Sequence, residues 1–355
     1  MPKVFYFAQT GNSHRHLEAA GLEVTLGKRE WHLPGADHTA DMIASAAGAV
    51  AFAGTSIRNS PISRAIMAST PDLRVVSKTS VGVDDVDVDA ATELGILVTH
   101  APVESNWGNI AEVTVTFMLA LLKGLNDQDA TIKEGGWWSE GTQGKYIGKR
   151  LSDGYAGLTV GIIGLGRIGA RVAQLLAPWH VTVLGYDPYV AVHRFLEFGV
   201  TPVDYETLLR TCDVVTMHVV LTKETRHMMS TKEFAMMKRD AYFINTSRGE
   251  CVDEAALCEA VETGVIAGCG LNAFEVEPIA ADSPLRRLGD KVLLRPHGGG
   301  VPSAAAAGPG RSESEATEWV NTDVLRALRG EVPIHVFNRD AIGPWVKRFG
   351  GKSLL

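Results

Sequence analysis

Three ionisable side chains in the second half of the chain each follow a short apolar run. Arg248 follows "YFINTS", Glu277 comes soon after "VIAGCGL", and His297 follows "KVLLRP". A histidine can take a proton from a hydroxyl group near neutral pH, and a neighbouring carboxylate orients its ring and favours the imidazolium form. An arginine grips a carboxylate through two hydrogen bonds. Together these residue types predict chemistry on an alcohol beside a carboxylate, that is, a 2-hydroxy acid and its 2-oxo acid.

Each of the three residues also has a plainer interpretation. Arg248 could form a surface salt bridge at a strand end, and His297 could be an exposed loop histidine, because ionisable groups usually lie at the surface. Glu277 could be a solvated loop acid, an interpretation that the sequence favours for Glu275. The segment "GLNAFEVEP" adds a further ambiguity, since it carries both Glu275 and Glu277. In an extended segment alternate side chains share a face, so geometry alone does not choose between these two carboxylates.

A glycine-rich loop opens the same half of the chain. The apolar run "TVGII" leads into Gly164-x-Gly166-x-x-Gly169, a helical pattern follows, and Asp187 ends the next apolar run. Such glycines allow a tight turn and close approach to a pyrophosphate, while the helix N-terminus offers N–H groups to the phosphates. An acidic residue at the position of Asp187 accepts hydrogen bonds from a ribose and repels a 2′-phosphate, which favours NAD over NADP. The alternative is a tight strand-to-helix turn without a ligand.

Short apolar runs alternate with helical patterns along nearly the whole chain. This alternation predicts parallel sheets covered by helices on both faces, with ligands at the carboxyl ends of the strands. Arg248, Glu277 and His297 are therefore expected at the edge that carries the glycine loop. The expected strands are residues 3–8, 23–26, 49–54, 74–79 and 96–100 in a first series, and 159–163, 182–186, 213–219, 242–247, 265–271 and 291–296 in a second. Helices are expected near residues 13–20, 37–47, 61–69, 85–94, 109–124, 167–177, 204–211, 231–238, 253–263 and 312–329.

Composition narrows the class of protein. A chain of 355 residues suggests two domains, and a net charge of −7 argues against a nucleic-acid partner. No apolar run is long enough for a membrane span, and the N-terminus lacks a leader pattern, so a cytoplasmic protein without a membrane partner is expected. The four cysteines lack zinc-like spacing and are expected to be reduced thiols. No metal site is predicted, and no HExxH motif or Cys/His cluster supports a metal-dependent hydrolase.

Several segments together resemble one known family. "GIIGLGRIG", "GYDP", "INTSRGECVDEAAL", "GLNAFEVEP" and "RPHGGG" are similar to motifs of the D-isomer-specific 2-hydroxyacid dehydrogenases. "TSVGVDDVDVDAATELGILVTHAPVESNWGNIAE" resembles the substrate domain of that family. The resemblance implies two doubly wound α/β domains: a flavodoxin-like substrate domain of residues 1–105 plus 325–355, and a Rossmann NAD-binding domain of residues 106–324. It also implies a homodimer formed through the NAD-binding domain.

The resemblance assigns a role to each candidate residue. It makes Arg248 the group that binds the substrate carboxylate, His297 the acid/base, and Glu277 rather than Glu275 the partner of His297. Backbone groups of Val81 and Gly82 are implied to hold the carboxylate from the substrate domain. The implied cofactor-binding residues are Gly164, Gly166, Arg167, Ile168, Gly169, Asp187, His218, Thr225, Thr246, Asn272 and Gly299.

The chain departs from the family pattern in places that leave other functions open. Asn272 stands where the family usually has Asp against the nicotinamide carboxamide, and the tail after about residue 330 is longer than usual. This tail is expected to pack on the substrate domain or on a partner subunit. An NAD(H)-sensing, corepressor-like protein with little turnover is the alternative to an enzyme. Formate dehydrogenases resemble the family too, but they have Gln at the position of Glu277.

Overall fold

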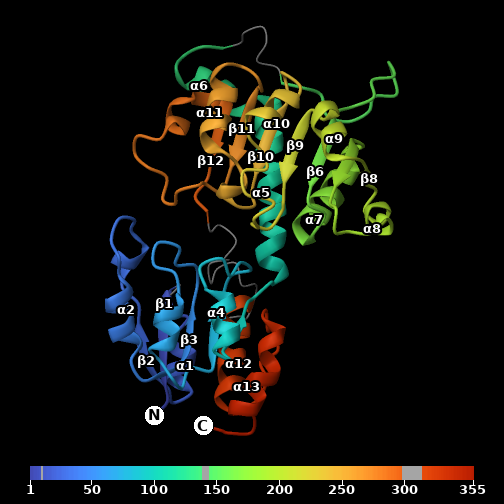
Figure 1. Ribbon diagram of the computed structural model, residues 1–355. Coiled ribbons are helices and arrows are strands. Elements are labelled where there is room, and N and C mark those ends of the chain that lie inside the picture. Colours follow the sequence, from blue (N-terminus) through green and yellow to red (C-terminus); the bar gives the residue numbers. More distant parts are fainter. Residues whose placement is uncertain (9–10, 138–143, 298–313) are drawn as a thin grey trace. The chain divides into compact units, whose positions relative to one another are not determined.

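The computed structural model describes residues 1–8, 11–137, 144–297 and 314–355, and the chain divides into two compact units (Figure 1). Unit 1 comprises residues 1–106 and 300–355, and unit 2 comprises residues 107–299. The predicted second boundary, between residues 324 and 325, differs from this division because it cuts through helix α12 (Glu315–Leu328). The whole helix belongs to unit 1, since Val320 and Val324 are buried in the core of that unit.

Unit 1 contains a five-stranded parallel sheet in the order β2-β1-β3-β4-β5. This is the flavodoxin-like order expected for the first series, and all five predicted strands are present. The strands are β1 (Lys3–Ala8), β2 (Glu23–Leu26), β3 (Ala49–Gly54), β4 (Val75–Lys78) and β5 (Leu97–Thr99). The helices are α1 (Arg15–Ala19), α2 (Thr39–Ala46), α3 (Arg64–Ala68), α4 (Val88–Glu93), α12 and α13 (Ile342–Phe349), with short 3-10 turns at Arg29–His32 and Arg339–Ala341.

Alternating side chains of this sheet supply two cores. Phe5, Phe52 and Val76 point into a cluster with helices α2, α3 and α4. Their neighbours Val4 and Val75 point the other way, into a cluster with α1, α12 and α13. Such two-sided burial is the reason why the strands appear in the sequence as nearly continuous apolar runs.

The C-terminal tail packs on unit 1. Trp345 of α13 is fully buried, and its indole Nε1 donates to the carbonyl oxygen of Arg74 at 2.8 Å. The side chain of Asn338 accepts from the N–H of Val98 at 2.7 Å and donates to the carbonyl of Ile96 at 3.0 Å. These bonds fasten the tail to the residue before β4 and to the first half of β5, so the tail is an integral part of unit 1.

Unit 2 contains a seven-stranded parallel sheet in the order β12-β11-β10-β9-β6-β7-β8. If β6 is counted as the first strand, this is the doubly wound dinucleotide-binding order, and β12 is one further strand at an edge. The strands are β6 (Thr159–Ile163), β7 (Thr182–Tyr186), β8 (Thr201–Pro202), β9 (Val214–Met217), β10 (Tyr242–Asn245), β11 (Gly268–Leu271) and β12 (Val292–Leu294). The helices are α5 (Glu104–Lys123), which begins in unit 1, α6 (Leu125–Lys133), α7 (Arg167–Leu176), α8 (Val192–Glu197), α9 (Tyr205–Thr211), α10 (Thr231–Met236) and α11 (Glu254–Glu262). Short 3-10 turns lie at Ala177–Trp179, Gly249–Cys251, Pro284–Arg287 and Gly289–Lys291.

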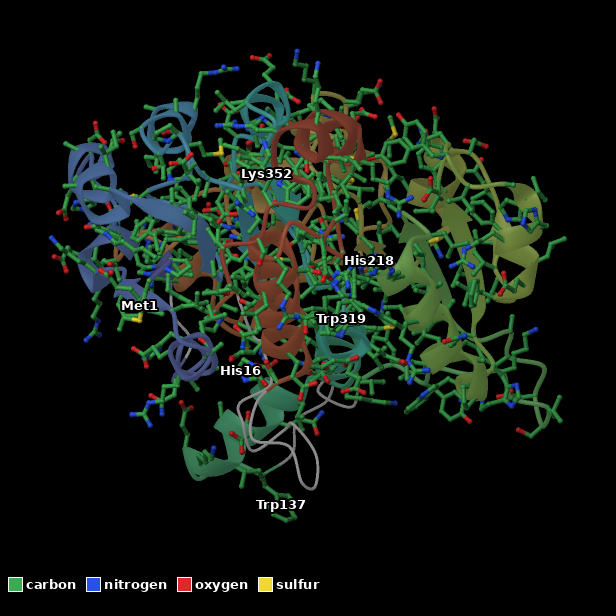
Figure 2. The ribbon with its side chains drawn as sticks, turned by 90° about the horizontal axis from the view of Figure 1, so that it is seen from below. Met1, His16, Trp137, His218, Trp319 and Lys352 are labelled. Carbon is green, nitrogen blue, oxygen red and sulfur yellow. The ribbon has the colours of Figure 1, made fainter. Side chains whose placement is uncertain are left out.

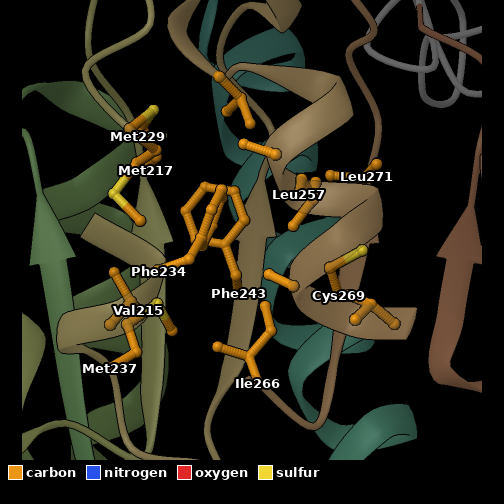
Figure 3. Close-up of a cluster of buried hydrophobic side chains, with 14 of the residues drawn as sticks. Val215, Met217, Met229, Phe234, Met237, Phe243, Leu257, Ile266, Cys269 and Leu271 are labelled. Carbon is orange, nitrogen blue, oxygen red and sulfur yellow. The ribbon is translucent and has the colours of Figure 1, made fainter. Parts of the chain in front are cut away.

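Helices cover both faces of the unit 2 sheet. On one face, α9, α10 and α11 pack against β9, β10 and β11. Phe234 of α10 meets Phe243 of β10 edge to face there, with ring centroids 5.4 Å apart (Figure 3). On the other face, α5 and α7 pack against β6 and β10. The α/β class and the two parallel sheets are therefore confirmed.

Three elements of unit 2 were not predicted from the sequence. Helix α6 begins after Gly124, whose φ of +57° ends α5, and none of its residues is buried. Helix α8 is only six residues long, and β8 is a two-residue edge strand that contains Pro202. A proline is tolerated at a sheet edge but weakens the sequence pattern of a strand, so short elements of this kind give little periodic signal.

Among the described residues, no single helix is long and apolar enough to cross a membrane. Helices α5 and α6 reach the required length and composition only as a pair, and this pair is bent by 60°.

Candidate active site

The glycine loop of unit 2 follows β6 as predicted. The N–H of Gly164 donates to the carbonyl of Tyr186 at 2.9 Å, which joins the loop to the end of β7. The carboxylate of Asp187 accepts from the N–H of Leu165 at 2.9 Å and from the N–H of Tyr189 at 3.0 Å. Asp187 therefore holds the loop in place from the neighbouring strand end, which is where a ribose would contact it.

The loop is open beside Gly166, where a phosphate group could approach, but it is tightly packed at Gly169. A Cβ on Gly166 would meet nothing within 4 Å, whereas a Cβ on Gly169 would lie 2.1 Å from the carbonyl oxygen of Gly164. Helix α7 begins directly after Gly166, and no side chain caps its first turn. An open approach beside an uncapped helix N-terminus fits a dinucleotide pyrophosphate, and Arg167 and Ile168 are the residues whose N–H groups would face it.

Two alanine substitutions in this loop should have different effects. We expect Gly166→Ala to keep the thermal stability and to weaken NADH binding roughly tenfold to a hundredfold, because the methyl group enters only the phosphate approach. Gly169→Ala should instead lower the free energy of unfolding by about 1–3 kcal/mol through overpacking against Gly164. Thermal melts and fluorescence titration with NADH measure the two effects. A Gly166→Ala protein that binds NADH normally would contradict the proposed approach.

The predicted acid/base pair is formed in the structure. His297 Nδ1 lies 2.8 Å from Oε1 and 3.0 Å from Oε2 of Glu277. The two side chains are 23% and 15% exposed, so the pair is partly shielded from solvent. Because the carboxylate occupies Nδ1, the ring presents Nε2 for proton exchange with a ligand.

Arg248 lies on the neighbouring loop, directly after β10. The Asn245 side chain shapes this loop, since it donates to the carbonyl of Arg248 at 2.9 Å and accepts from the N–H and hydroxyl of Ser247 at 3.0 and 2.7 Å. A Cβ on Gly249 would lie only 1.9 Å from the carbonyl carbon of Phe274. Glycine at this position therefore lets the Arg248 loop contact the segment that carries Glu277, as the parallel pairing of β10 and β11 requires.

Glu275 makes a set of contacts that the sequence did not predict. Its carboxylate lies 2.5 Å from His227 Nε2 and also accepts from the N–H of Glu254 at 3.2 Å. The side chain is 30% exposed, whereas the sequence favoured a solvated loop acid. The missed partner, His227, has no local sequence signal, because it lies in the loop after β9, 48 residues earlier.

Comparison with known proteins supports what this geometry suggests. Residues 115–299 match the family model described as "D-isomer specific 2-hydroxyacid dehydrogenase, NAD binding domain". The chain is 37% identical to a glyoxylate reductase of Korarchaeum cryptofilum over 291 residues, which cover 81% of this chain and 82% of that protein. The chain belongs to the D-isomer-specific 2-hydroxyacid dehydrogenase family. It is thus an NAD-dependent oxidoreductase that acts on CH–OH groups, as the motifs predicted.

Two further relatives show how far the similarity extends. A D-3-phosphoglycerate dehydrogenase of Archaeoglobus fulgidus is 39% identical over 232 residues, which cover 65% of this chain but only 42% of that longer protein. The crystal structure of the TT0316 protein from Thermus thermophilus has a TM-score of 0.76 at 28% identity and covers 95% of this chain and 99% of that one. Different members of the family therefore match this dehydrogenase, and the substrate is not fixed by similarity.

Two residues predicted to line the nicotinamide, His218 and Thr246, directly follow β9 and β10, and Thr246 contacts Thr114 of α5. Thr246 Oγ1 is 2.9 Å from Thr114 Oγ1 and 3.4 Å from His218 Nδ1, and His218 Nε2 is 3.0 Å from Thr216 Oγ1. Burial lowers the pKa of His218 to about 3, so this imidazole is neutral at physiological pH (labelled in Figure 2). The hydroxyl of Thr225 donates to the carbonyl of Val220 at 2.7 Å within the loop after β9.

Asn272 is almost completely buried at the end of β11. Its side-chain amide donates to the carbonyl of Pro296 at 3.0 Å, and its backbone N–H donates to the carbonyl of Asn245 at 3.0 Å. The predicted contact with the nicotinamide carboxamide stays a prediction. An aspartate could not donate to Pro296, so the amide adds a bond that holds the residue before His297.

The predicted carboxylate-binding turn of unit 1 follows β4. The carbonyl of Val81 lies 2.9 Å from Nδ1 of His100, and the carbonyl of Gly82 accepts from the Ser80 hydroxyl at 2.8 Å. The support from His100 was not predicted. Gly299, the last of the predicted cofactor-binding residues, lies outside the described residues.

A buried ion pair fixes the start of this turn. Lys78 Nζ lies 2.5 Å from Asp85 Oδ2 and donates to the carbonyl of Thr55 at 2.8 Å, and the same carboxylate accepts from the N–H of Ile57 at 2.6 Å. Burial lowers the pKa of Lys78, and the charge of Asp85 opposes this effect. A buried pair with these additional hydrogen bonds fixes the geometry of the turn more than it adds stability.

Proposed function

We propose that this dehydrogenase interconverts a D-2-hydroxy acid and its 2-oxo acid, with His297 as the acid/base and Glu277 as its partner. The observation that supports this most strongly is the Glu277–His297 pair, which lies on the same unit as the glycine loop. In the oxidative direction His297 accepts the hydroxyl proton at Nε2, and Glu277 stabilises the imidazolium through Nδ1. In the reductive direction the imidazolium returns that proton to the carbonyl oxygen.

The substrate carboxylate is assigned to Arg248, whose fork suits two charged hydrogen bonds. The turn at Val81 and Gly82 is proposed as a second carboxylate-binding element, built within unit 1. NAD, when bound, supplies the acceptor or donor of the hydride. Its proposed contacts in the described residues are the glycine loop with Arg167 and Ile168, Asp187, His218, Thr225, Thr246 and Asn272.

NADH consumption with a panel of 2-oxo acids tests this function. The panel runs from glyoxylate, through pyruvate and hydroxypyruvate, to bulky aromatic oxo acids, and includes the oxo acid derived from 3-phosphoglycerate. Turnover with one of them is the expected result, and the order of kcat/KM defines the substrate class. NADH binding without turnover on any member would contradict the proposal and favour a sensor protein.

A homodimer in the cytoplasm completes the proposal. Within the described residues, helix α6 buries none of its side chains, and Leu125, Ile132 and the nearby Trp137 are 58%, 48% and 85% exposed. The Trp137 ring projects away from its surroundings in Figure 2. Exposed apolar groups clustered on one short helix support a subunit contact through unit 2.

A further inference from the structure

Two glutamates on one loop each contact a histidine. Glu277 lies 2.8 Å from His297, and Glu275 lies 2.5 Å from His227, measured between carboxylate oxygen and ring nitrogen. Only the first pair has a role in the proposed reaction. The second pair lies two residues away on the same segment, so whatever fixes Glu275 also restricts the position of Glu277.

The N-terminus of α11 fixes Glu275 from one side. The Glu275 carboxylate accepts from the N–H of Glu254, the first residue of the helix, and the N–H of Glu275 lies 3.3 Å from the Glu254 carboxylate. Burial raises the pKa of Glu254. A carboxylate suits this position, because the helix N-terminus offers it a backbone N–H and the positive end of the helix dipole.

The β9 loop fixes Glu275 from the other side through His227. His227 has a φ of +50°, which is uncommon for a residue other than glycine and costs about 1 kcal/mol or more. Its N–H donates to the carbonyl of Glu250 at 2.9 Å. The surroundings of His227 hold this left-handed conformation, in which the imidazole ring lies against Glu275.

The residue directly before Glu275 transmits this position to Glu277. The N–H of Phe274 donates to Oε1 of Glu277 at 3.0 Å, which is the oxygen that also contacts His297. The contact between Gly249 and Phe274 prevents movement of the segment toward the Arg248 loop. A shift at Glu275 would therefore move the backbone donor that orients the Glu277 carboxylate.

We propose that Glu275 is a positioning residue for proton transfer: by bridging His227 and the N-terminus of α11, it holds the Phe274 N–H and hence the Glu277 carboxylate against His297. This inference rests on the proposed function of His297 and Glu277. It assigns the second carboxylate of the loop a part in the reaction without contact with the substrate. It also joins the loop after β9, which carries the predicted cofactor residues His218 and Thr225, to the acid/base pair.

A double-mutant cycle tests the proposal on the full-length enzyme. We expect Glu275→Ala to lower kcat roughly tenfold to a hundredfold while KM for the oxo acid changes less than about threefold. In the Glu277→Gln background the same substitution should lower kcat less than about threefold, because the position of that side chain no longer matters. Equal losses of kcat in the two backgrounds would overturn the proposal.

Variants of the partner and of a neighbouring acid complete the design. His227→Gln, which keeps a donor for Glu275, should retain most of kcat, whereas His227→Ala should resemble Glu275→Ala. Glu259 is an exposed residue of α11, the helix whose N-terminus contacts Glu275, and Glu259→Gln should leave kcat unchanged. If His227→Gln lost as much activity as His227→Ala, the hydrogen bond would not be the operative feature.

Hydrogen exchange provides a measurement that does not depend on turnover. The amides of Phe274 and Glu254 should exchange faster in Glu275→Ala than in the unmodified protein, while amides in the centre of β10 should not. Unchanged exchange at Phe274 would overturn the positioning role even in a protein with no measurable turnover. Failure of the unmodified protein to reduce any oxo acid, with the expected exchange pattern, would instead contradict only the proposed function.

Discussion

His297→Asn should lower kcat for the preferred 2-oxo acid by roughly 10²–10⁴-fold, the usual contribution of a general acid–base group. The asparagine amide can still donate to Glu277, but it cannot carry a proton at the position of Nε2. NADH binding should stay within about twofold of the unmodified protein, because the glycine loop and Asp187 lie on other strand ends. Steady-state kinetics and fluorescence titration measure the two quantities.

Two further variants make this test specific. His180→Asn is a matched control, because His180 is exposed, lies before the amino end of β7, and has a φ of +53° that asparagine tolerates. Glu277→Gln should lower kcat roughly tenfold to a hundredfold, since it keeps the shape but removes the charge that stabilises the imidazolium. Full kcat in His297→Asn would rule out the acid/base role, whatever the substrate.

The sequence predicted the sheets because their strands are buried on both faces. Val214 and Val215 point to opposite cores, as do Phe243 and Ile244, so each strand appears as an apolar run with clear ends. Since parallel strands share one carboxyl edge, these ends also predicted that His297 and Glu277 lie together. The elements of unit 2 that were missed, α6, α8 and β8, are short or exposed and contribute little to either core. Helix α13 of unit 1 was missed as well, although its Trp345 and Phe349 are buried.

The contacts that position the site residues were harder to predict from the sequence. His227 and Glu275 are 48 residues apart, and His100 and Val81 are 19 apart. Each contact depends on how two loops fold over a strand end, for which no periodic pattern exists. Asn272 shows the same limit: resemblance predicted a contact with a nicotinamide, whereas the bond from its amide to Pro296 is visible only in the folded protein.

Glu275 and Glu277 illustrate how geometry resolves what residue type cannot. Residue type alone does not distinguish these two carboxylates, and an extended segment would put them on one face. In the structure each meets a different histidine, and both His227 and His297 come from other loops. The distinction between a proton-transfer partner and an anchor thus arises from tertiary contacts alone.

Arg248→Lys should lower kcat/KM for the preferred 2-oxo acid by roughly 10²–10³-fold, mainly through KM. Lysine keeps the positive charge, but it loses the planar pair of donors, and charged hydrogen bonds contribute about 1.5–3 kcal/mol each. The Asn245 side chain and the Ser247 carbonyl orient the Arg248 loop and guanidinium, so a flexible ammonium gains less from the same loop. Steady-state kinetics over a range of oxo acid concentrations measures the effect.

A change of substrate shows whether this loss comes from the carboxylate. The amide of the same oxo acid lacks the negative charge, so Arg248→Lys should change its kcat/KM less than about threefold. Arg239→Lys is the matched control: Arg239 is exposed, precedes the amino end of β10, and donates from Nε to the carbonyl of Gly264 at 3.3 Å, away from the carboxyl edge of the sheet. Equal losses on the acid and on its amide would show that Arg248 supports the fold of the loop rather than the substrate. Because the carboxylate distinguishes a 2-oxo acid from a simple carbonyl compound, this comparison also tests why the enzyme would select its substrate class.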